Sequence, residues 1–259
     1  MYKALITDID GTLVPVTGNG STIGEPTAQA FKAAINSGCK IGVATGRGWQ
    51  STKPIVERLG IIDPCIIEGG SCIINPSTEK IIWQRELDPE TSRQVVEILK
   101  RLATHTELIK SAAIPERIPA KEADAGNYQL PNRVIYLLGA TKELALAAQQ
   151  ALRGLPTIAA NLTTPSWASP ELYDVHVTHK EGTKSQALQE WMRLLHLDKS
   201  ECIGVGDSAN DIPLFEAVGL TVAVGNATDD LKEQADVVAP NRDDGALKYV
   251  LQKFILDRS

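Results

Sequence analysis

The sequence predicts an α/β protein, in which a core of parallel strands is covered by helices on both faces and is interrupted by an inserted α+β unit. Apolar runs of strand length alternate with amphipathic segments over residues 4–74 and again over 183–259. A different rhythm, helix followed by two strands and then repeated, occupies the residues between. Polar and acidic residues directly follow several core strands, where ligands of parallel sheets bind.

The first core segment reads as a βαβαβ pattern. Ala4-Leu5-Ile6 is an apolar run, typical of a strand buried on both faces. Pro26 and Gly38 bracket a helix with helically spaced apolar residues. The remaining elements are expected as a strand at 39–48, a helix at 49–60 that ends at Gly60, and a strand, turn and strand at 65–74.

The rhythm changes near residue 85. Asp88 and Pro89 predict the start of a helix that reaches about Ala103. The other expected elements are strands at 107–114, 133–140, 157–163 and 171–179, a helix at 141–155 and a polar, proline-rich stretch at 115–132. We therefore expect a small α+β domain at 83–179, a lid by its position in the chain, inserted into a core domain of 1–82 and 180–259.

From Gly182 the first rhythm returns, which favours one core domain made of two chain segments. The expected helices lie at 183–197, 210–218, 228–235 and from about 244, and the expected strands at 202–208, 221–226 and 236–240.

Composition excludes several classes of protein. A net charge of −6 argues against a broad nucleic-acid or anionic-membrane surface. No apolar run approaches the roughly 18 residues of a membrane span, and the opening MYKALITDID has acids where a signal peptide needs its hydrophobic region. The 4 cysteines are scattered without CxxC spacing, as in a reduced core. We expect a cytoplasmic protein, monomeric or homodimeric.

Four short stretches lie at strand ends or at a helix start facing them: DIDGT (8–12), ATGR (44–47), GTKS (182–185) and GDSAND (206–211). Phosphoryl transfer requires a nucleophile in line with the leaving oxygen, a divalent cation, donors for the equatorial oxygens and an acid for the leaving group. The four stretches offer a candidate for each requirement.

The first stretch supplies the reacting carboxylates. Side chains two positions apart in extended chain point the same way, so Asp8 and Asp10 can reach one site. Asp8, at the strand tip, is the expected nucleophile, and Asp10 the expected acid and base. The turn at Gly11 and Thr12 is expected to leave amide groups free for phosphate oxygens.

The other stretches are expected to neutralise charge. Asp207 and Asp211 offer hard oxygen ligands suited to Mg²⁺, Asp207 directly and Asp211 through a bound water. Thr45 would give its hydroxyl and N–H to a phosphate oxygen in a loop kept tight by Gly46. Lys184 would add a point charge to the same group. Ser208 and Asn210 are nearby hydrogen-bonding candidates, and Asn210 can also cap its helix. Arg47 either helps to bind the phosphoryl group or faces solvent.

Each signal also has an ordinary structural interpretation: turn chemistry for DIDGT, helix caps for Thr45 and Asn210, and a surface lysine for Lys184. Their joint placement favours the functional one. A P-loop and a dinucleotide motif are excluded by spacing. His176 and His179 point to opposite faces of a strand, which argues against a metal pair. Three tryptophans are more typical of packing than of a stacking platform: Trp83, Trp167 and Trp191.

These residues resemble the haloacid dehalogenase superfamily of aspartyl-phosphate hydrolases, through DIDGTL, the threonine of ATGR, the lysine of KSQAL and the acidic pair of GDSAND. The position of the insertion resembles the large α/β cap of the Cof-like and sucrose-phosphatase-like branch. The resemblance implies a Rossmann-like core, Asp8 as nucleophile, Asp10 as acid and base, Thr45 and Lys184 as phosphate binders, and Mg²⁺ held by Asp8, Asp207 and the Asp10 carbonyl.

Two positions depart from the family pattern. Glu68-Gly69-Gly70 stands where many Cof-like members have Asn-Gly, and Ser185 follows the lysine in place of the commoner glycine. A glutamate beside phosphate is repulsive unless it meets a hydroxyl or a cation of the substrate. The departures therefore bear on the substrate and not on the reaction class.

The sequence thus predicts a Mg²⁺-dependent phosphatase for a small phosphorylated metabolite, a sugar phosphate or a phosphoglycolate-like acid. Cap loops at PAKEADAGNY (119–128) or TPSWASP (164–170) are expected to contact the substrate. The alternatives are a phosphoryl transferase or mutase, and a non-catalytic phosphosugar-binding module. Dehalogenation is disfavoured because it has no use for Mg²⁺-binding acids.

Overall fold

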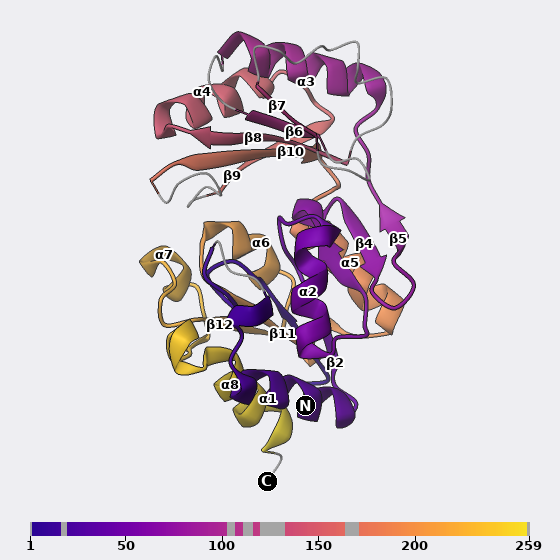
Figure 1. Ribbon diagram of the computed structural model, residues 1–259, viewed down its shortest axis with the longest axis vertical. Helices are drawn as coiled ribbons and strands as arrows, with labels where there is room; N and C mark the ends of the chain where they lie inside the picture. Colours follow the sequence, from indigo (N-terminus) through magenta and orange to yellow (C-terminus); the bar gives the residue numbers. More distant parts are fainter. Residues whose placement is uncertain are drawn as a thin grey trace. The chain divides into compact units, whose positions relative to one another are not determined.

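The structure is a computed structural model that describes residues 2–16, 20–102, 107–110, 116–119, 133–163 and 171–257. Contacts between Cα atoms divide the chain into two compact units, Met1–Trp83 with Lys184–Ser259, and Gln84–Thr183. The first unit is built around a sheet of β-strands with helices on both sides (Figure 1). This arrangement confirms the predicted fold class.

The sheet of the first unit has the order β13-β12-β11-β1-β2, and every neighbouring pair is parallel. β1 lies between two strands and pairs with both, Ala4 opposite Cys202 on one side and Lys40 on the other. The strands are β1 (Ala4–Thr7), β2 (Lys40–Val43), β11 (Cys202–Gly206), β12 (Leu220–Ala223) and β13 (Val237–Val238).

Both faces of this sheet are buried, as the uninterrupted apolar runs predict. Leu5 packs into one hydrophobic cluster with Phe31 of helix α1, and the next residue, Ile6, packs into another with Trp191 of helix α5. All these side chains are fully buried, so Trp191 belongs to the core and not to a stacking platform. The four cysteines are buried thiols, in agreement with a reduced core.

Helices cover each face according to their apolar stripes. α1 (Glu25–Asn36), α2 (Trp49–Leu59) and α8 (Ala246–Leu251) supply the first cluster, and α5 (Lys184–Leu195) with α6 (Ile212–Phe215) supplies the second. α2 ends at Gly60 with a φ of 70°, as the sequence predicts. The other helical elements are η1 (Gly20–Thr22), η5 (Lys199–Glu201), η6 (Ala209–Asp211), α7 (Asp229–Lys232), η7 (Arg242–Asp244) and η8 (Gln252–Leu256).

The third predicted strand departs from the simple βαβαβ pattern. β3 (Cys65–Ile67) is linked to the parallel sheet by a bridge between Ala44 and Ile66, and pairs antiparallel with β4 (Cys72–Asn75). β5 (Lys80–Gln84) completes this second, three-stranded sheet. The turn η2 (Glu68–Gly70) reverses the chain too tightly for the crossover that a parallel neighbour would need.

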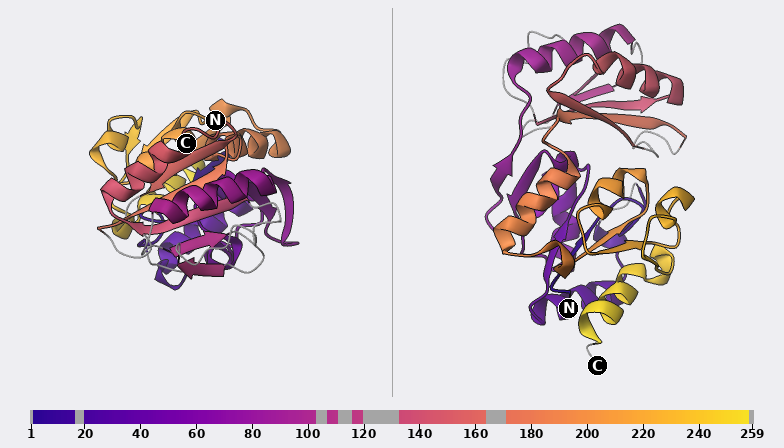
Figure 2. Two further views of the ribbon diagram at one scale, coloured as in Figure 1. Left: turned by 90° about the horizontal axis from the view of Figure 1, so that it is seen from above. Right: turned by 180° about the vertical axis from the view of Figure 1, so that it is seen from behind.

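The second unit is a five-stranded sheet of order β7-β6-β8-β10-β9, and α3 and α4 lie on one of its faces (Figures 1 and 2). Val95 and Leu99 of α3 pack with Ile135 of β8. Asp88 caps α3 by accepting from the Thr91 amide at 2.9 Å. The elements are α3 (Pro89–Leu102), β6 (Glu107–Lys110), β7 (Glu116–Pro119), β8 (Val134–Ala140), α4 (Lys142–Leu152), β9 (Ile158–Thr163) and β10 (Tyr173–His179).

One strand of this unit was not predicted. β7 lies in the stretch expected to be polar and irregular, and pairs antiparallel with β6, with Glu107 opposite Pro119. Pro119 is the last residue of β7, a position where the missing N–H is tolerated. Of the two predicted substrate loops, residues 120–128 and 164–170, with Trp167, lie outside the described residues. Among the helices that are described, none combines the length and the apolarity needed to cross a membrane.

Candidate active site

The site is built at the carboxyl ends of β1 and β11, where the sequence places its acids. Asp8 follows β1 and is 2% exposed. Its Oδ1 accepts from Lys184 Nζ at 2.7 Å, and the same ammonium donates to Asp211 Oδ1 at 2.8 Å. Lys184, the first residue of α5, is 6% exposed and so is not a surface lysine. A buried ammonium between two carboxylates satisfies three groups that would otherwise be costly to bury.

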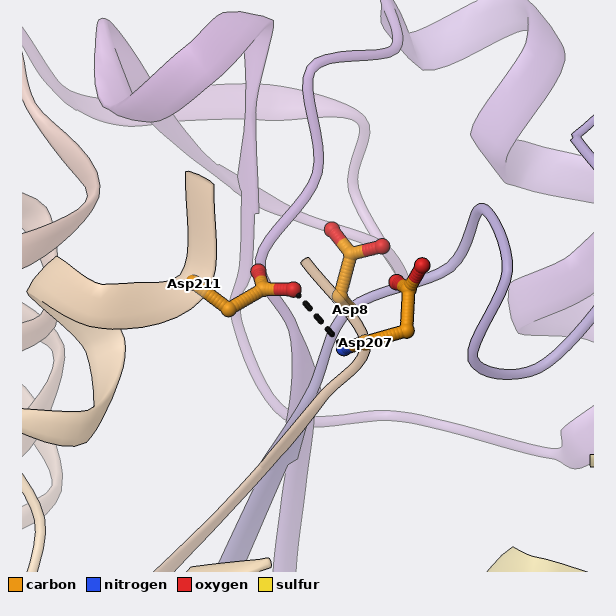
Figure 3. Close-up of side chains that lie close together, drawn as sticks. All are labelled: Asp8, Asp207 and Asp211. Atoms are coloured by element: carbon orange, nitrogen blue, oxygen red, sulfur yellow. Dashed lines mark hydrogen bonds between the residues drawn. The ribbon is translucent and has the colours of Figure 1, made fainter. Parts of the chain in front are cut away.

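Three acids converge on one point. One carboxylate oxygen from each of Asp8, Asp207 and Asp211 lies within 4.8 Å of the others (Figure 3). Asp211 Oδ2 accepts from the Asp207 amide at 3.0 Å and from the Ser208 amide at 3.3 Å, which fixes the turn η6. Three hard oxygen donors at this spacing fit a small divalent cation. The residues present therefore suit a metal site.

The loop after β1 is held by its own backbone. The Gly11 amide donates to Val14 O at 2.8 Å and the Thr12 amide to Ile9 O at 3.3 Å. These two amides are therefore not available to phosphate, because the loop closes on itself as a tight turn. In the part of the chain described, the amides of Ile9 and Asp10 make no hydrogen bond.

Thr12 and Gly11 both lie against the side chain of Asp207. Thr12 Oγ1 donates to Asp207 Oδ1 at 2.9 Å, and Thr12 is fully buried. Gly11 has a φ of 82°, and a Cβ at this position would collide with the Asp207 carboxylate. Only glycine combines this backbone conformation with such a close approach. Both residues thus orient a predicted metal ligand.

Thr45 and Gly46 lie in the loop after β2. The Thr45 amide donates to Ile66 O at 3.0 Å. It is therefore not available to phosphate, in contrast to the prediction. The Thr45 hydroxyl accepts from the Arg47 amide at 3.1 Å, and its own proton remains to be donated. Thr45 is fully buried and caps no helix, since α2 starts after Gly48.

Asn210 lies in η6 beside the acids. Its Oδ1 accepts from Ser208 Oγ at 2.6 Å. The residue that precedes η6 is Ser208, so the predicted capping role belongs to Ser208 and not to Asn210. The Nδ2 group is the part of Asn210 that can donate to a ligand.

Asp10 lies in contact with Arg47, which the sequence left undecided between assistance and solvent exposure. Arg47 is 5% exposed, and its guanidinium donates to Asp10 Oδ2 at 2.9 Å from Nε and to Asp10 Oδ1 at 2.5 Å from Nη2. The sequence offered no local signal for this pair, because the two residues belong to different loops that meet only in the folded sheet.

Asn226 is a residue near the acids that sequence analysis missed. Its Nδ2 donates to Gly11 O at 2.8 Å, and its Oδ1 accepts from the Arg242 amide at 2.8 Å. Asn226 therefore ties the loop after β1 to the loop after β12. Its position in the loop that follows a core strand is the same signal that identified the other site residues.

Glu68 lies in the turn η2 in an unusual conformation. Its φ is 53°, in the left-handed region, and it is 6% exposed. The Glu68 amide donates to Arg47 O at 2.8 Å, and the Gly69 amide to Thr45 O at 3.0 Å. The turn that departs from the family pattern is therefore bound to the loop carrying Thr45 and Arg47.

Burial is the largest cause of the raised pKa values of three acids in the site. Burial raises the pKa of Asp8 well above its ordinary value, although Lys184 opposes this. Burial also raises the pKa of Asp10, against the hydrogen bonds from Arg47. Burial and the neighbouring Asp211 raise the pKa of Asp207 to about 7. Desolvation alone would lower the pKa of Lys184, but Asp211 and Asp8 outweigh it and raise that pKa. A bound cation would favour the ionised form of Asp8, Asp10 and Asp207.

Comparison with known proteins gives consistent matches over the whole chain. The family model for haloacid dehalogenase-like hydrolases matches residues 5–251. The putative phosphatase YxeH of Bacillus subtilis is 22% identical over 273 residues, 99% of each chain. A phosphoglycolate phosphatase of Methanopyrus kandleri is 26% identical over 261 residues, 98% of each chain.

Solved structures match the fold. A haloacid dehalogenase-like hydrolase from B. subtilis superposes with a TM-score of 0.81 at 19% identity, covering 97% of this chain and 99% of that one. A sugar phosphatase of superfamily subclass IIB superposes with a TM-score of 0.78 at 22% identity, covering 97% of this chain and 98% of that one.

Proposed function

This chain belongs to the haloacid dehalogenase-like hydrolase family, and from that premise we propose that it is a Mg²⁺-dependent phosphatase of small phosphorylated metabolites. The observation that carries the proposal is the convergence of Asp8, Asp207, Asp211 and Lys184 at one end of the core sheet. The relatives named phosphatases support the reaction class.

Asp8 is the proposed nucleophile. Lys184 binds Oδ1, and among the described residues Oδ2 accepts no hydrogen bond, so Oδ2 is the oxygen that attacks phosphorus. In the first step the Asp8 oxygen forms a bond to phosphorus while the bond to the ester oxygen breaks. The departing alkoxide takes a proton from the protonated carboxyl of Asp10, and Asp8 becomes an acyl phosphate.

In the second step Asp10, now a carboxylate, removes a proton from water as the water oxygen attacks phosphorus. The bond between phosphorus and Asp8 breaks, which regenerates the Asp8 carboxylate and releases inorganic phosphate. Several donors are proposed to hold the phosphate oxygens. They are the Thr45 hydroxyl, the Lys184 ammonium, the Asn210 side-chain amide and the backbone amides of Ile9 and Asp10. Gly11, Thr12 and Gly46 are proposed to shape these loops and not to bind phosphate themselves.

Asp8, Asp207 and the Asp10 carbonyl would hold Mg²⁺, with Asp211 orienting the Asp207 backbone and binding Lys184. The bound ion would neutralise the phosphate charge that otherwise repels Asp8. The donor set of carboxylate oxygens, and the raised pKa values of Asp8 and Asp207, support this assignment. The side chain of Asp10 is engaged by Arg47 and is not proposed as a direct ligand.

The substrate is proposed to be a sugar phosphate or a phosphoglycolate-like acid, because the matched relatives include proteins named for these substrates. We propose that the inserted unit is the cap domain that selects the substrate, with the predicted boundaries at 83 and 179. A mutase would share the first step and differ in the acceptor of the phosphoryl group. We propose a cytoplasmic location.

Hydrolysis of p-nitrophenyl phosphate and of a panel of phosphorylated metabolites tests the proposal. We expect phosphate release that stops on addition of a chelator and returns with Mg²⁺. Asp8→Asn should lose nearly all turnover while retaining the fold, because an amide oxygen is a poor nucleophile. Activity that is indifferent to chelator, or an active Asp8→Asn variant, would refute the proposed site.

A further inference from the structure

Asn226 lies in the loop at residues 224–228, between β12 and α7, and joins two backbone groups that are distant in the chain. Its Nδ2 donates to Gly11 O at 2.8 Å, and its Oδ1 accepts from the Arg242 amide at 2.8 Å. A carbonyl only accepts and an amide N–H only donates, so the side chain needs one donor and one acceptor at its end. The asparagine amide supplies both, whereas a carboxylate at this position could not donate to Gly11 O.

The contact with Gly11 O restrains the peptide between Gly11 and Thr12. Gly11 has a φ of 82°, and a glycine leaves both neighbouring peptide planes free to rotate. The plane before it is held by the Gly11 amide, which donates to Val14 O at 2.8 Å. The plane after it is held by Asn226 at 2.8 Å and by the Thr12 amide, whose contact with Ile9 O is longer at 3.3 Å. Asn226 therefore makes the shorter hydrogen bond to the peptide that leads into Thr12.

That peptide bears on the position of Asp207. Thr12 Oγ1 donates to Asp207 Oδ1 at 2.9 Å, so a rotation of the peptide would move this donor away from the carboxylate. The loop that carries Asn226 also binds Asp207 directly, because the Thr228 amide donates to Asp207 O at 2.8 Å. One loop thus fixes the Asp207 backbone directly and the Asp207 carboxylate through the turn after β1.

The exposure of Asn226 separates this role from packing. Asn226 is exposed and so belongs to no hydrophobic cluster. Water replaces the hydrogen bonds of an exposed side chain when it is removed, so such bonds contribute little net stability. Loss of the Asn226 side chain should therefore affect the orientation of Asp207 more than the stability of the fold.

We propose that Asn226 is a positioning residue, which holds the turn after β1 so that Thr12 orients Asp207 as a ligand of the divalent cation. The inference rests on the proposed function. Both hydrogen-bond partners of Asn226 are backbone groups, so its effect on the cation passes through the turn and not through direct contact.

Isothermal titration of the metal-free protein with Mg²⁺ tests the proposal. We expect the dissociation constant for Mg²⁺ to rise by about 10- to 100-fold in Asn226→Ala, as for other groups that orient a metal ligand. Saturating Mg²⁺ should bring kcat for p-nitrophenyl phosphate close to the wild-type value, because the side chains of Asp8 and Asp10 are unchanged.

Asn75→Ala is the matched control. Asn75 also binds two backbone groups, since its Oδ1 accepts from the Ser77 amide at 3.0 Å and from the Thr78 amide at 3.1 Å in the turn between β4 and β5. Its replacement removes two hydrogen bonds, as Asn226→Ala does, and should leave the Mg²⁺ affinity unchanged. Equal weakening of Mg²⁺ binding in both variants would give Asn226 a general structural role and overturn the proposal.

A double-mutant cycle tests the route through Thr12. If Asn226 acts by placing the Thr12 hydroxyl, its loss matters little once that hydroxyl is absent. The double variant of Thr12→Val with Asn226→Ala should therefore bind Mg²⁺ nearly as tightly as Thr12→Val alone. Independent effects, in which the two fold-losses multiply, would contradict the proposal, and so would an unchanged Mg²⁺ affinity in Asn226→Ala.

If Asn226→Ala does not fold, as judged by circular dichroism, Asn226→Asp decides. This variant keeps the acceptor for the Arg242 amide and loses the donor to Gly11 O. Its added negative charge would by itself tighten the binding of a cation, so weaker binding supports the proposal and equal or tighter binding overturns it. A wild type that binds no Mg²⁺ would instead remove the proposed function, and with it this role of Asn226.

Discussion

The ammonium of Lys184 lies 2.7 Å from Oδ1 of Asp8, although the two residues are 176 positions apart. The contact joins the first residue of α5 to the end of β1, and the same ammonium reaches Asp211 at 2.8 Å. It is the buried cation on which the pairing of these two acids depends.

Replacing Lys184 by Met should therefore affect stability as well as activity. Two buried carboxylates would lose their partner, which costs about 3–5 kcal/mol in comparable buried ion pairs. We expect a lower free energy of unfolding in chelator, partly restored by Mg²⁺, and no measurable phosphatase activity. Urea denaturation with and without Mg²⁺ measures the free energy of unfolding. A variant as stable as the wild type in chelator would show that the contact is energetically neutral.

The stability of the metal-free protein should fall as pH rises from about 4 to about 7. The pKa of Asp207 is about 7 in the folded protein against an ordinary 3.8, so the folded state binds the proton more tightly than the unfolded state. Rising pH then favours the unfolded chain across this window and has no further effect of this kind above it.

The matched variant for this prediction is Asp207→Asn, which removes the titrating group. The difference in unfolding free energy between variant and wild type in chelator should grow between pH 5 and pH 7.5, and Mg²⁺ should reduce it by stabilising the wild type alone. A difference that is independent of pH would contradict the raised pKa.

Thr12→Val should weaken metal binding while keeping the shape of the side chain. The hydroxyl that donates to Asp207 Oδ1 at 2.9 Å is lost, and loss of such an orienting hydrogen bond typically costs about 10- to 100-fold in metal affinity. Isothermal titration with Mg²⁺ measures the change. Thr12→Ser keeps the donor and should bind nearly as tightly as the wild type, and equal weakening in both variants would argue against the hydrogen bond.

Gly11→Ala should disable the site, whereas Gly38→Ala should only strain the backbone. Both glycines have positive φ, 82° and 89°, but a Cβ at Gly11 meets the Asp207 carboxylate and a Cβ at Gly38 meets nothing within 4 Å. Each variant is expected to lose about 1–2 kcal/mol of stability from the left-handed backbone. Loss of Mg²⁺ affinity and kcat should be confined to Gly11→Ala, so equal losses in Gly38→Ala would contradict the steric argument.

Glu68→Gln should change substrate preference, because Glu68 lies buried in the turn bound to the Thr45 and Arg47 loop. Ratios of kcat/KM over a panel of sugar phosphates and carboxylate-bearing phosphates measure the effect, which should differ between neutral and charged substrates. His196→Gly is the control, since His196 also has a positive φ of 55° but is exposed. It should gain about 0.5–1 kcal/mol of stability and leave the preference unchanged.

Prediction from the sequence worked best where a signal is local. The strands before Asp8 and Asp207 are short apolar runs, and Gly60 ends α2 by the conformation that glycine tolerates. It failed where the backbone has a choice of partners. The Gly11 and Thr45 amides bond within and between loops, and β4 turns back antiparallel, because hydrogen-bond partners are settled by residues distant in the chain.

By itself the sequence determined the α/β fold class, the order of the core elements and the placement of the acids at strand ends, since periodicity and strand-end position depend on neighbouring residues. The tertiary structure alone decided the pairing of Arg47 with Asp10, of Asn226 with Gly11 and of Thr12 with Asp207. The physical reason is that a hydrogen bond requires contact at about 3 Å, and only the folded sheet brings these loops to that distance.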